Sequence, residues 1–432
     1  MVTLTHVCQY WRRAIISSPG SWTSIDSNRK KLAPLFLECS GAASLSADIS
    51  VEGVDFEEDE DFMRALLPHV PRISNLSLYG FQPIEDLETH LPSFFASPMP
   101  NLTSLKLEQE EESTDPFPPE GVPTPQLFQN VSKLKSLHLT GVPLYPVLRN
   151  IKSLAELTLV SDTFPFQEFL GFLESNPNLE ILDLDVLFAN TPALATPERL
   201  ISFPRLRRLT LRCGDATSTR ALLSCLSLSH GINIEVYQTN PNPPPLASFL
   251  PCPSTHILGL FAPIIIIKYL SPPGTLHLSS KNGSFSFRGC KPSRVAHEEL
   301  DLFATCAVRE FRLRLGNQCR LSWTLGRLPK LEALVISNGS LEPEFLSVLA
   351  EDPVLCPSLK TIAFLECELT NEAVHGLGGI LAKRAHSIAA RLHRVVIVNR
   401  TRDLPNRHLV SHLQRFIPQV DIAVGNKLPD LL

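Results

Sequence analysis

Two histidines near the C-terminus have a spacing that could bind a metal ion. His408 and His412 stand four residues apart in a segment expected to be helical, so both imidazoles could face one ion. A zinc site needs three or four protein ligands, and no third ligand stands near this pair. We therefore interpret both as surface histidines and expect no metal site.

Two aspartates could form a carboxylate pair of the kind that glycosidases use. Asp183 and Asp185 alternate with leucines, which places both on one face of a strand. The next strand of a parallel sheet, about 4.8 Å away, would bring Thr210 and Arg212 beside them. A ladder of charged and polar side chains is the simpler interpretation.

Sequence motifs of enzymes are absent. The chain contains no Gly-x-x-x-x-Gly-Lys-Ser/Thr, no Gly-x-Ser-x-Gly and no His-Glu-x-x-His. Gly376, Gly378 and Gly379 do not follow a strand as phosphate-binding glycines do, and we expect them to loosen or cap a helix. The sequence therefore predicts a protein without catalytic residues, cofactor or metal.

The composition argues against several classes of protein. With 432 residues the chain exceeds one ordinary core, so several domains or a repeat array is expected. A net charge of −5 gives no basic field for nucleic acid. The ten cysteines lack the density of a disulfide scaffold, which favours a reducing intracellular location, cytoplasmic or nuclear. We expect no membrane segment, because the most apolar run, 258–267, is broken by Pro263 and is too short.

The pattern Leu-x-x-Leu-x-Leu recurs along most of the chain. Leu182 and Leu184, for example, alternate with aspartates, as in a strand with one buried face. Successive copies in the first half begin 29, 32, 20, 25 and 27 residues apart. The copies begin at Ile73, Leu102, Leu134, Leu154, Leu179 and Leu206, and later at Val308, Leu331, Leu359, Leu392 and Ile417.

Amphipathic helices are expected between these strands. Phe166, Phe169, Leu170 and Leu173 give one apolar stripe over two turns. Strand, loop, helix and loop at this period require a parallel sheet with the helices on its outer side. The pattern fades over 239–305, where the strand-like segments at 276–278 and 285–287 depart from it.

This organisation resembles the leucine-rich-repeat proteins, whose repeats are ~20–29 residues long. The resemblance implies an α/β solenoid over residues 41–432, with a curved parallel sheet and helices on the convex side. Asparagine rarely follows the third apolar residue, so hydrogen bonding between repeats must be met in other ways.

The outward side chains between the leucines would form one concave strip, which we predict to be partner-binding. The strip turns apolar after residue 330, and Val335, Leu365, Val396 and Val398 would be an exposed apolar patch. Its candidate binding residues are Lys106, His138, Thr158, Asp183, Thr210, Arg212, Arg312, Arg314, Val335 and Val396.

Residues 1–40 differ from the repeats. The segment Val7-Cys8-x-x-Trp11-Arg12, followed by Pro19-x-x-Trp22-x-x-Ile25, resembles the second half of an F-box, in particular that of basidiomycete-type fungal proteins. In that family a Leu-Pro-x-Glu helix precedes this segment; it is missing here, so we expect an N-terminally truncated F-box. The resemblance implies contact with a Skp-type adaptor through Leu4, Val7, Cys8, Trp11, Pro19 and Trp22.

Together, the two resemblances imply a substrate-recognition subunit of a cullin–RING (SCF) ubiquitin ligase. It would bind an unidentified protein substrate through the repeats, without performing chemistry. One alternative is a repeat scaffold that binds a protein partner without any ligase. Another is an enzyme built on a parallel β-solenoid, against which the helix at 166–173 argues.

Overall fold

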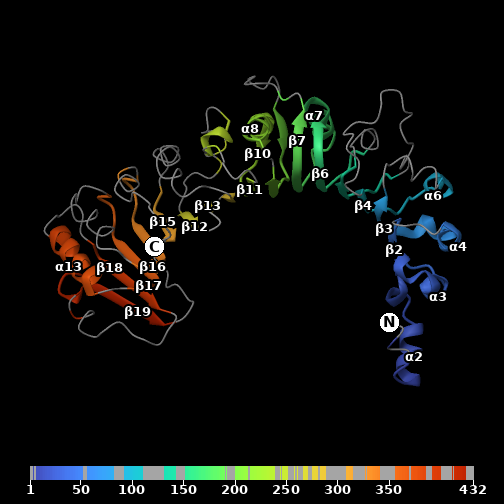
Figure 1. Cartoon of the computed structure of the whole chain (residues 1–432), viewed down its shortest axis with the longest axis horizontal. Helices are drawn as coiled ribbons and strands as arrows, with labels where there is room; N and C mark the ends of the chain where they lie inside the picture. The colour runs from blue at the N-terminus through green and yellow to red at the C-terminus, as the bar shows by residue number, and fades with distance from the viewer. Residues whose placement is uncertain are drawn as a thin grey trace. The chain divides into compact units, whose positions relative to one another are not determined.

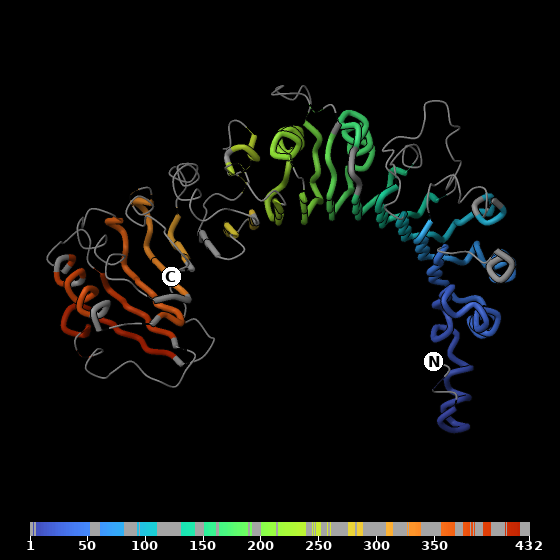
Figure 2. The backbone as a smooth tube through the Cα atoms, viewed as in Figure 1, coloured from blue at the N-terminus to red at the C-terminus, as the bar shows by residue number. Residues whose placement is uncertain are grey.

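The computed structural model describes a mixed α/β chain that divides into two compact units (Figure 1). Unit 1 comprises Met1–Pro192 with Arg199–Arg208, and unit 2 comprises Ala193–Glu198 with Leu209–Leu432. Segments outside the described residues are grey in Figure 2. The described residues are 3, 6–51, 56–81, 92–109, 131–142, 151–189, 191, 200–212, 215–238, 244, 246–251, 257, 260, 266–270, 275–280, 283–288, 308–314, 326, 328–340, 356–368, 371–385, 392–399, 411 and 413–424.

Unit 1 opens with a short helical segment and continues as parallel strands alternating with helices. The opening elements are α2 (Gln9–Ile16), η1 (Pro19–Trp22), β1 (Ser24–Asp26), η2 (Ser27–Leu32) and α3 (Ala33–Cys39). Strands β1 to β7 pair in chain order, and every pair is parallel. The remaining elements are β2 (Leu45–Ser50), α4 (Phe56–Leu66), η3 (Leu67–Arg72), β3 (Ile73–Phe81), α6 (Pro92–Ala96), β4 (Ser104–Gln109), β5 (Ser136–Thr140), β6 (Glu156–Pro165), α7 (Phe166–Ser175), β7 (Ile181–Ala189) and β8 (Ile201–Phe203).

The leucines of the repeated pattern stack in register in unit 1. Leu137 lies between Leu105 and Leu157, and Leu157 pairs with Leu182; all four are at most 1% exposed. Full burial of a leucine contributes about 1.5–3 kcal/mol, and each strand needs its neighbours to achieve it. The expectation of one parallel sheet through the copies at 102, 134, 154 and 179 is confirmed.

The predicted helix at 166–173 is α7, and it packs through aromatic side chains. Phe169 lies 5.8 Å from Phe164 of β6 and 5.3 Å from Phe188 of β7, measured between ring centroids. Phe166 meets Phe188 edge-on at 5.4 Å. Figure 1 also shows α4 and α6 beside β3 and β4. Alternation of strand and helix therefore buries a continuous core in unit 1.

Hydroxyl groups and one asparagine supply hydrogen bonds between successive repeats. Ser74 Oγ donates to the Leu45 carbonyl at 3.1 Å, and Thr103 Oγ1 donates to the Ser74 carbonyl at 3.0 Å. Ser153 Oγ likewise donates to the Leu134 carbonyl at 2.9 Å. These groups sit where the strands begin, and they add side-chain hydrogen bonds to the backbone ones between successive strands.

Unit 2 combines parallel strands with one antiparallel insertion. Its strands β15 to β19 pair in chain order and in parallel. The strand β9 (Arg208–Leu211) lies where the two units divide. The elements that follow it are α8 (Ala216–Cys225), β10 (Leu226–Leu228), β11 (Asn233–Tyr237), η5 (Leu246–Ser248), β12 (Ile266–Leu270), β13 (Thr275–Ser280), β14 (Gly283–Arg288), β15 (Glu310–Arg314), β16 (Ala333–Ser340), β17 (Thr361–Glu368), α13 (Asn371–Ala385), β18 (Arg394–Asn399) and β19 (Gln419–Val424).

The region of fading pattern departs from the all-parallel expectation. The strand-like segments predicted at 276–278 and 285–287 are confirmed as β13 and β14, but these two strands are antiparallel, as are β12 and β13. Only two residues join β13 to β14, and so short a connection can form only a hairpin. At Gly283, φ is +130° and an added Cβ would lie 2.2 Å from the Ile232 carbonyl oxygen, so glycine is required there.

The predicted exposed apolar patch after residue 330 is wrong. Val335, Ala363 and Val396 do lie in register on successive strands, but they are at most 1% exposed. With Val398 they form a buried cluster, against which Leu365 packs. The reason is visible in β18, whose run Val395–Val398 is apolar at every position, as in parallel strands buried on both faces.

Among the described residues, no helix combines the length and apolar character needed to cross a bilayer.

Candidate functional site

The N-terminal helix α2 is attached to unit 1 by a buried tryptophan. Trp22 is 1% exposed, and its Nε1 donates to the Ile15 carbonyl of α2 at 2.7 Å. Its ring meets Phe36 of α3 edge-on, with 5.1 Å between centroids. These contacts satisfy the indole N–H and join the end of α2 to η1 and α3.

The first turn of α2 and the residues just before it carry large apolar side chains that are open to solvent. Val7 is 60% exposed, Tyr10 77% and Trp11 47%. Tyr10 and Trp11 are neighbours in the first turn of α2, and Val7 lies just before its N-cap, Cys8. We call Val7, Tyr10 and Trp11 the N-terminal apolar surface. An exposed group of this kind on a fixed helix favours docking of another protein.

The residues predicted to contact an adaptor have different positions in the structure. Val7, Cys8, Trp11 and Pro19 are exposed, whereas Leu4 lies outside the described residues. Trp22 is buried, because it anchors α2, and is not available for contact. The exposure of Tyr10 was not predicted from the sequence, although its place beside Trp11 in an amphipathic helix could have indicated it.

The predicted polar strip is present on β4 to β7 of unit 1. Lys106, His138, Thr158 and Asp183 lie side by side in register, and all are half-buried. Lys106 Nζ lies 2.8 Å from Glu108 Oε1 on the same strand. The strip therefore presents an ordered set of polar groups rather than independent solvated side chains.

His138 lies at the centre of this strip. Its Nε2 is 3.1 Å from Thr140 Oγ1 and 3.6 Å from Glu108 Oε1. Burial lowers the pKa of His138 and the charge of Lys106 lowers it further, against the opposite effects of Glu108 and Asp183. The imidazole is therefore held neutral at neutral pH, where it can both donate and accept a hydrogen bond.

The strip residues of unit 2 are less accessible. Thr210 is 4% exposed, and the guanidinium of Arg212 stacks over Tyr237 at 5.4 Å from the ring centroid. Arg312 pairs through Nε with the buried carboxylate of Glu310. The side chain of Arg314, like His408 and His412, lies outside the described part of the chain. Val335 and Val396 are buried, as described above. Among the described strip residues, the row of polar side chains on successive strands is thus in unit 1.

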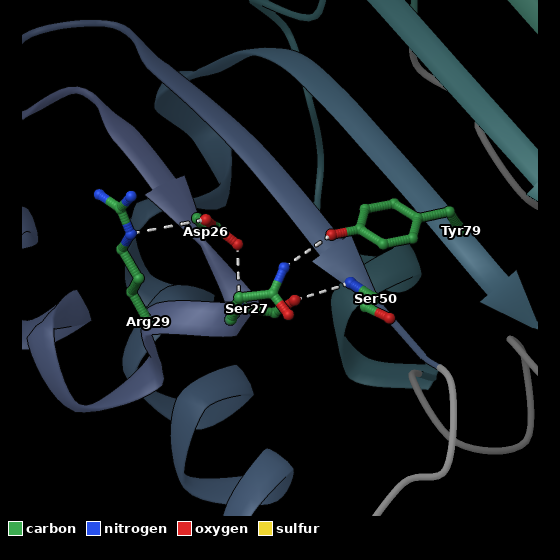
Figure 3. A network of polar contacts seen from close by, with 6 residues as sticks. Asp26, Ser27, Arg29, Ser50 and Tyr79 are labelled. Carbon is green, nitrogen blue, oxygen red and sulfur yellow. Dashed lines mark hydrogen bonds and ion pairs between the residues drawn. The ribbon is translucent and has the colours of Figure 1, made fainter.

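A polar cavity that the sequence analysis did not predict lies at the β1 edge of unit 1. It has a volume of about 480 Å³ and is lined by η2 together with Ser50 of β2. Figure 3 shows the polar contacts around it, in which Ser27 Oγ accepts from Ser50 N at 2.7 Å and Asn28 Nδ2 donates to the Tyr79 hydroxyl at 3.3 Å. The run Arg29-Lys30-Lys31 was the available signal in the sequence.

No group of three or more histidines, cysteines or carboxylates among the described residues is arranged to hold a metal ion. The sequence matches no protein-family model, and no curated protein is significantly similar to it. The interpretation of the site therefore depends on its geometry.

Proposed function

We propose that this chain is an F-box-type, leucine-rich-repeat subunit that selects a protein substrate for a cullin–RING ubiquitin ligase. The N-terminal apolar surface would dock on a Skp-type adaptor, and the polar strip of unit 1 would bind the substrate. The observation that carries the proposal is the pairing of an exposed apolar face on α2 with a buried tryptophan that fixes it.

The strand geometry supports the repeat part of the proposal. Four neighbouring pairs of strands in unit 1, from β3 to β7, keep the same register of leucines and outward polar side chains. Each repeat contacts mainly its neighbours, which is the arrangement of a solenoid with one extended binding face. We propose that this sheet is the curved sheet of a leucine-rich-repeat solenoid, with the helices on the convex side.

The energetics of α2 support docking rather than a purely structural role. Tyr10 is 77% exposed and Trp11 47%, and an aromatic hot-spot residue buried in an interface contributes about 2 kcal/mol or more to binding. A helical cap would need only the inward residues Ile15 and Trp22, which are already buried.

The test is binding of the purified chain to a purified fungal Skp-type adaptor. We expect one-to-one binding that Trp11→Ala weakens at least tenfold, because the variant removes the largest exposed ring of the surface. Leu187→Ala is the matched control, since Leu187 is 45% exposed but lies on β7, away from α2. Equal binding by both variants would exclude the proposed docking surface.

A repeat scaffold without ligase association is the second candidate. It is favoured by the polar strip alone, which needs no adaptor to bind a partner. Absence of any adaptor binding by the unmodified chain would support the scaffold and remove the ligase assignment.

A further inference from the structure

An exposed serine lies just after the end of α2, directly before a proline. Ser18 follows Ser17, the C-cap of α2, and precedes Pro19, the first residue of η1. It is exposed, and its backbone is not helical, with φ −107° and ψ 87°. Proline disfavours the helical conformation in the residue before it. A protein kinase must bring the acceptor hydroxyl against its catalytic aspartate, and an exposed, non-helical residue allows this.

The other described hydroxyl residues that precede a proline are less accessible. Six serines or threonines precede a proline in the sequence, and Ser18, Ser97 and Thr191 are the described ones. Ser97 Oγ donates to the Ser93 carbonyl at 2.9 Å, and Thr191 Oγ1 donates to the Phe188 carbonyl at 3.3 Å. Both residues are half-buried. Among the described residues, Ser18 therefore has the most accessible hydroxyl next to a proline.

The backbone of Ser18 takes part in the attachment of α2. The Ile15 carbonyl accepts hydrogen bonds from Ser18 N at 3.1 Å and from Trp22 Nε1 at 2.7 Å. This carbonyl belongs to the last turn of α2, where the helix dipole is negative. A phosphate on Ser18 would add up to two negative charges at this end and destabilise it. Arg13 of the last turn is exposed, and an exposed ion pair with the phosphate would offset only part of this effect.

We propose that Ser18 is an acceptor site for a proline-directed protein kinase, and that its phosphate loosens the attachment of α2. A bond forms between Ser18 Oγ and the γ-phosphorus of ATP as the bond from that phosphorus to the bridging oxygen breaks. ADP leaves, and the hydroxyl proton passes to the catalytic aspartate of the kinase. The consequence for adaptor binding rests on the proposed function, because α2 carries part of the N-terminal apolar surface.

The test of the site is phosphorylation of the purified full chain by an active mitogen-activated protein kinase with MgATP, followed by mass spectrometry. We expect Ser18 to be modified about tenfold faster than Ser97 or Thr191, whose hydroxyls must first leave their backbone partners. Ser18→Ala should remove this fast incorporation. Ser17→Ala is the matched control and should leave it unchanged, because Ser17 is a neighbouring exposed serine that precedes no proline.

Hydrogen–deuterium exchange of the phosphorylated and unmodified chains, both without adaptor, measures the effect on α2. We expect about three- to tenfold faster exchange over residues 9–18 after phosphorylation, because the last turn of α2 is destabilised. The kinase-treated Ser18→Ala chain should exchange as the unmodified chain does.

The proposal is overturned if Ser18 is modified no faster than Ser97, or if exchange over α2 is the same in the phosphorylated chain. Neither measurement uses the adaptor, so this result is separate from the binding test of the proposed function.

Discussion

At the scale of single residues, one buried asparagine joins two repeats of unit 1. Asn176 is fully buried, and its side chain makes three hydrogen bonds to the backbone. Its Nδ2 donates to the Ile151 and Phe172 carbonyls at 3.0 and 3.1 Å, and its Oδ1 accepts from Leu154 N at 3.3 Å. The repeat pattern does not indicate this role, because the asparagine of leucine-rich repeats is expected after the strand, whereas Asn176 lies in the loop before it.

Replacing this asparagine should destabilise unit 1. Asn176→Ala leaves three buried backbone groups without partners, and we expect a loss of about 2–4 kcal/mol in the free energy of unfolding. Asn178→Ala, at an exposed position of the same loop, should change it by less than about 0.5 kcal/mol. Urea unfolding followed by circular dichroism measures both. A similar small effect for the two variants would show that Asn176 does not join the repeats.

The lowered pKa of His138 predicts a dependence of stability on pH. The unfolded chain binds a proton on this residue at higher pH than the folded chain does. The contribution of neutral His138 to the free energy of unfolding is therefore complete above the unfolded pKa of about 6.5. That contribution is lost as the pH falls below 6.5. The groups facing His138 are Lys106, Glu108, Thr140 and Asp183.

The variant His138→Gln should therefore lose part of the fall in melting temperature between pH 7 and pH 5. Substitution of the exposed His393 by glutamine is the control, and should leave the pH dependence unchanged. Thermal unfolding followed at several pH values tests this. An unaltered pH profile in His138→Gln would contradict the assigned environment of the imidazole.

At the scale of elements, two glycines differ in whether their positions tolerate a side chain. In the β13–β14 hairpin, Gly283 has a positive φ and no room for a Cβ. In α13, Gly379 has no atom within 4 Å of an added Cβ and needs no special conformation. Gly283→Ala should destabilise the chain by about 2 kcal/mol or more, whereas Gly379→Ala should stabilise it by about 0.5–1 kcal/mol through helix propensity.

Thermal unfolding of the two glycine variants distinguishes these effects by sign. A lower melting temperature is expected for Gly283→Ala and a higher one for Gly379→Ala. Shifts in the same direction would show that one of the two backbone environments is incorrectly assigned.

The strands were predictable because alternation at a period of two is a local property. Each copy from Leu102 to Leu179 therefore indicated its own strand, and the short spacing between copies indicated parallel pairing. The direction of β13 was not predictable, since two apolar positions in a short segment specify a strand but no partner. Burial of Val335 and Trp22 depends on what packs against them, which is a tertiary property.

At the scale of the whole molecule, the proposed function assigns folding and partner binding to different sets of residues. The in-register leucines stabilise the sheet of unit 1, and this fixed sheet positions the polar strip and the anchored helix α2. No described residue is needed for chemistry in this account. The protein would act by holding two partners together, so its activity depends on surface residues that contribute little to folding.

Hydrogen–deuterium exchange of the full chain, with and without a purified Skp-type adaptor, tests the central claim most directly. The account predicts slower exchange over residues 6–16, because docking on the N-terminal apolar surface would shield α2. The strands β4–β7, whose hydrogen bonds are already protected in the sheet, should change little. Unaltered exchange over residues 6–16 at saturating adaptor concentration would contradict the proposed docking surface.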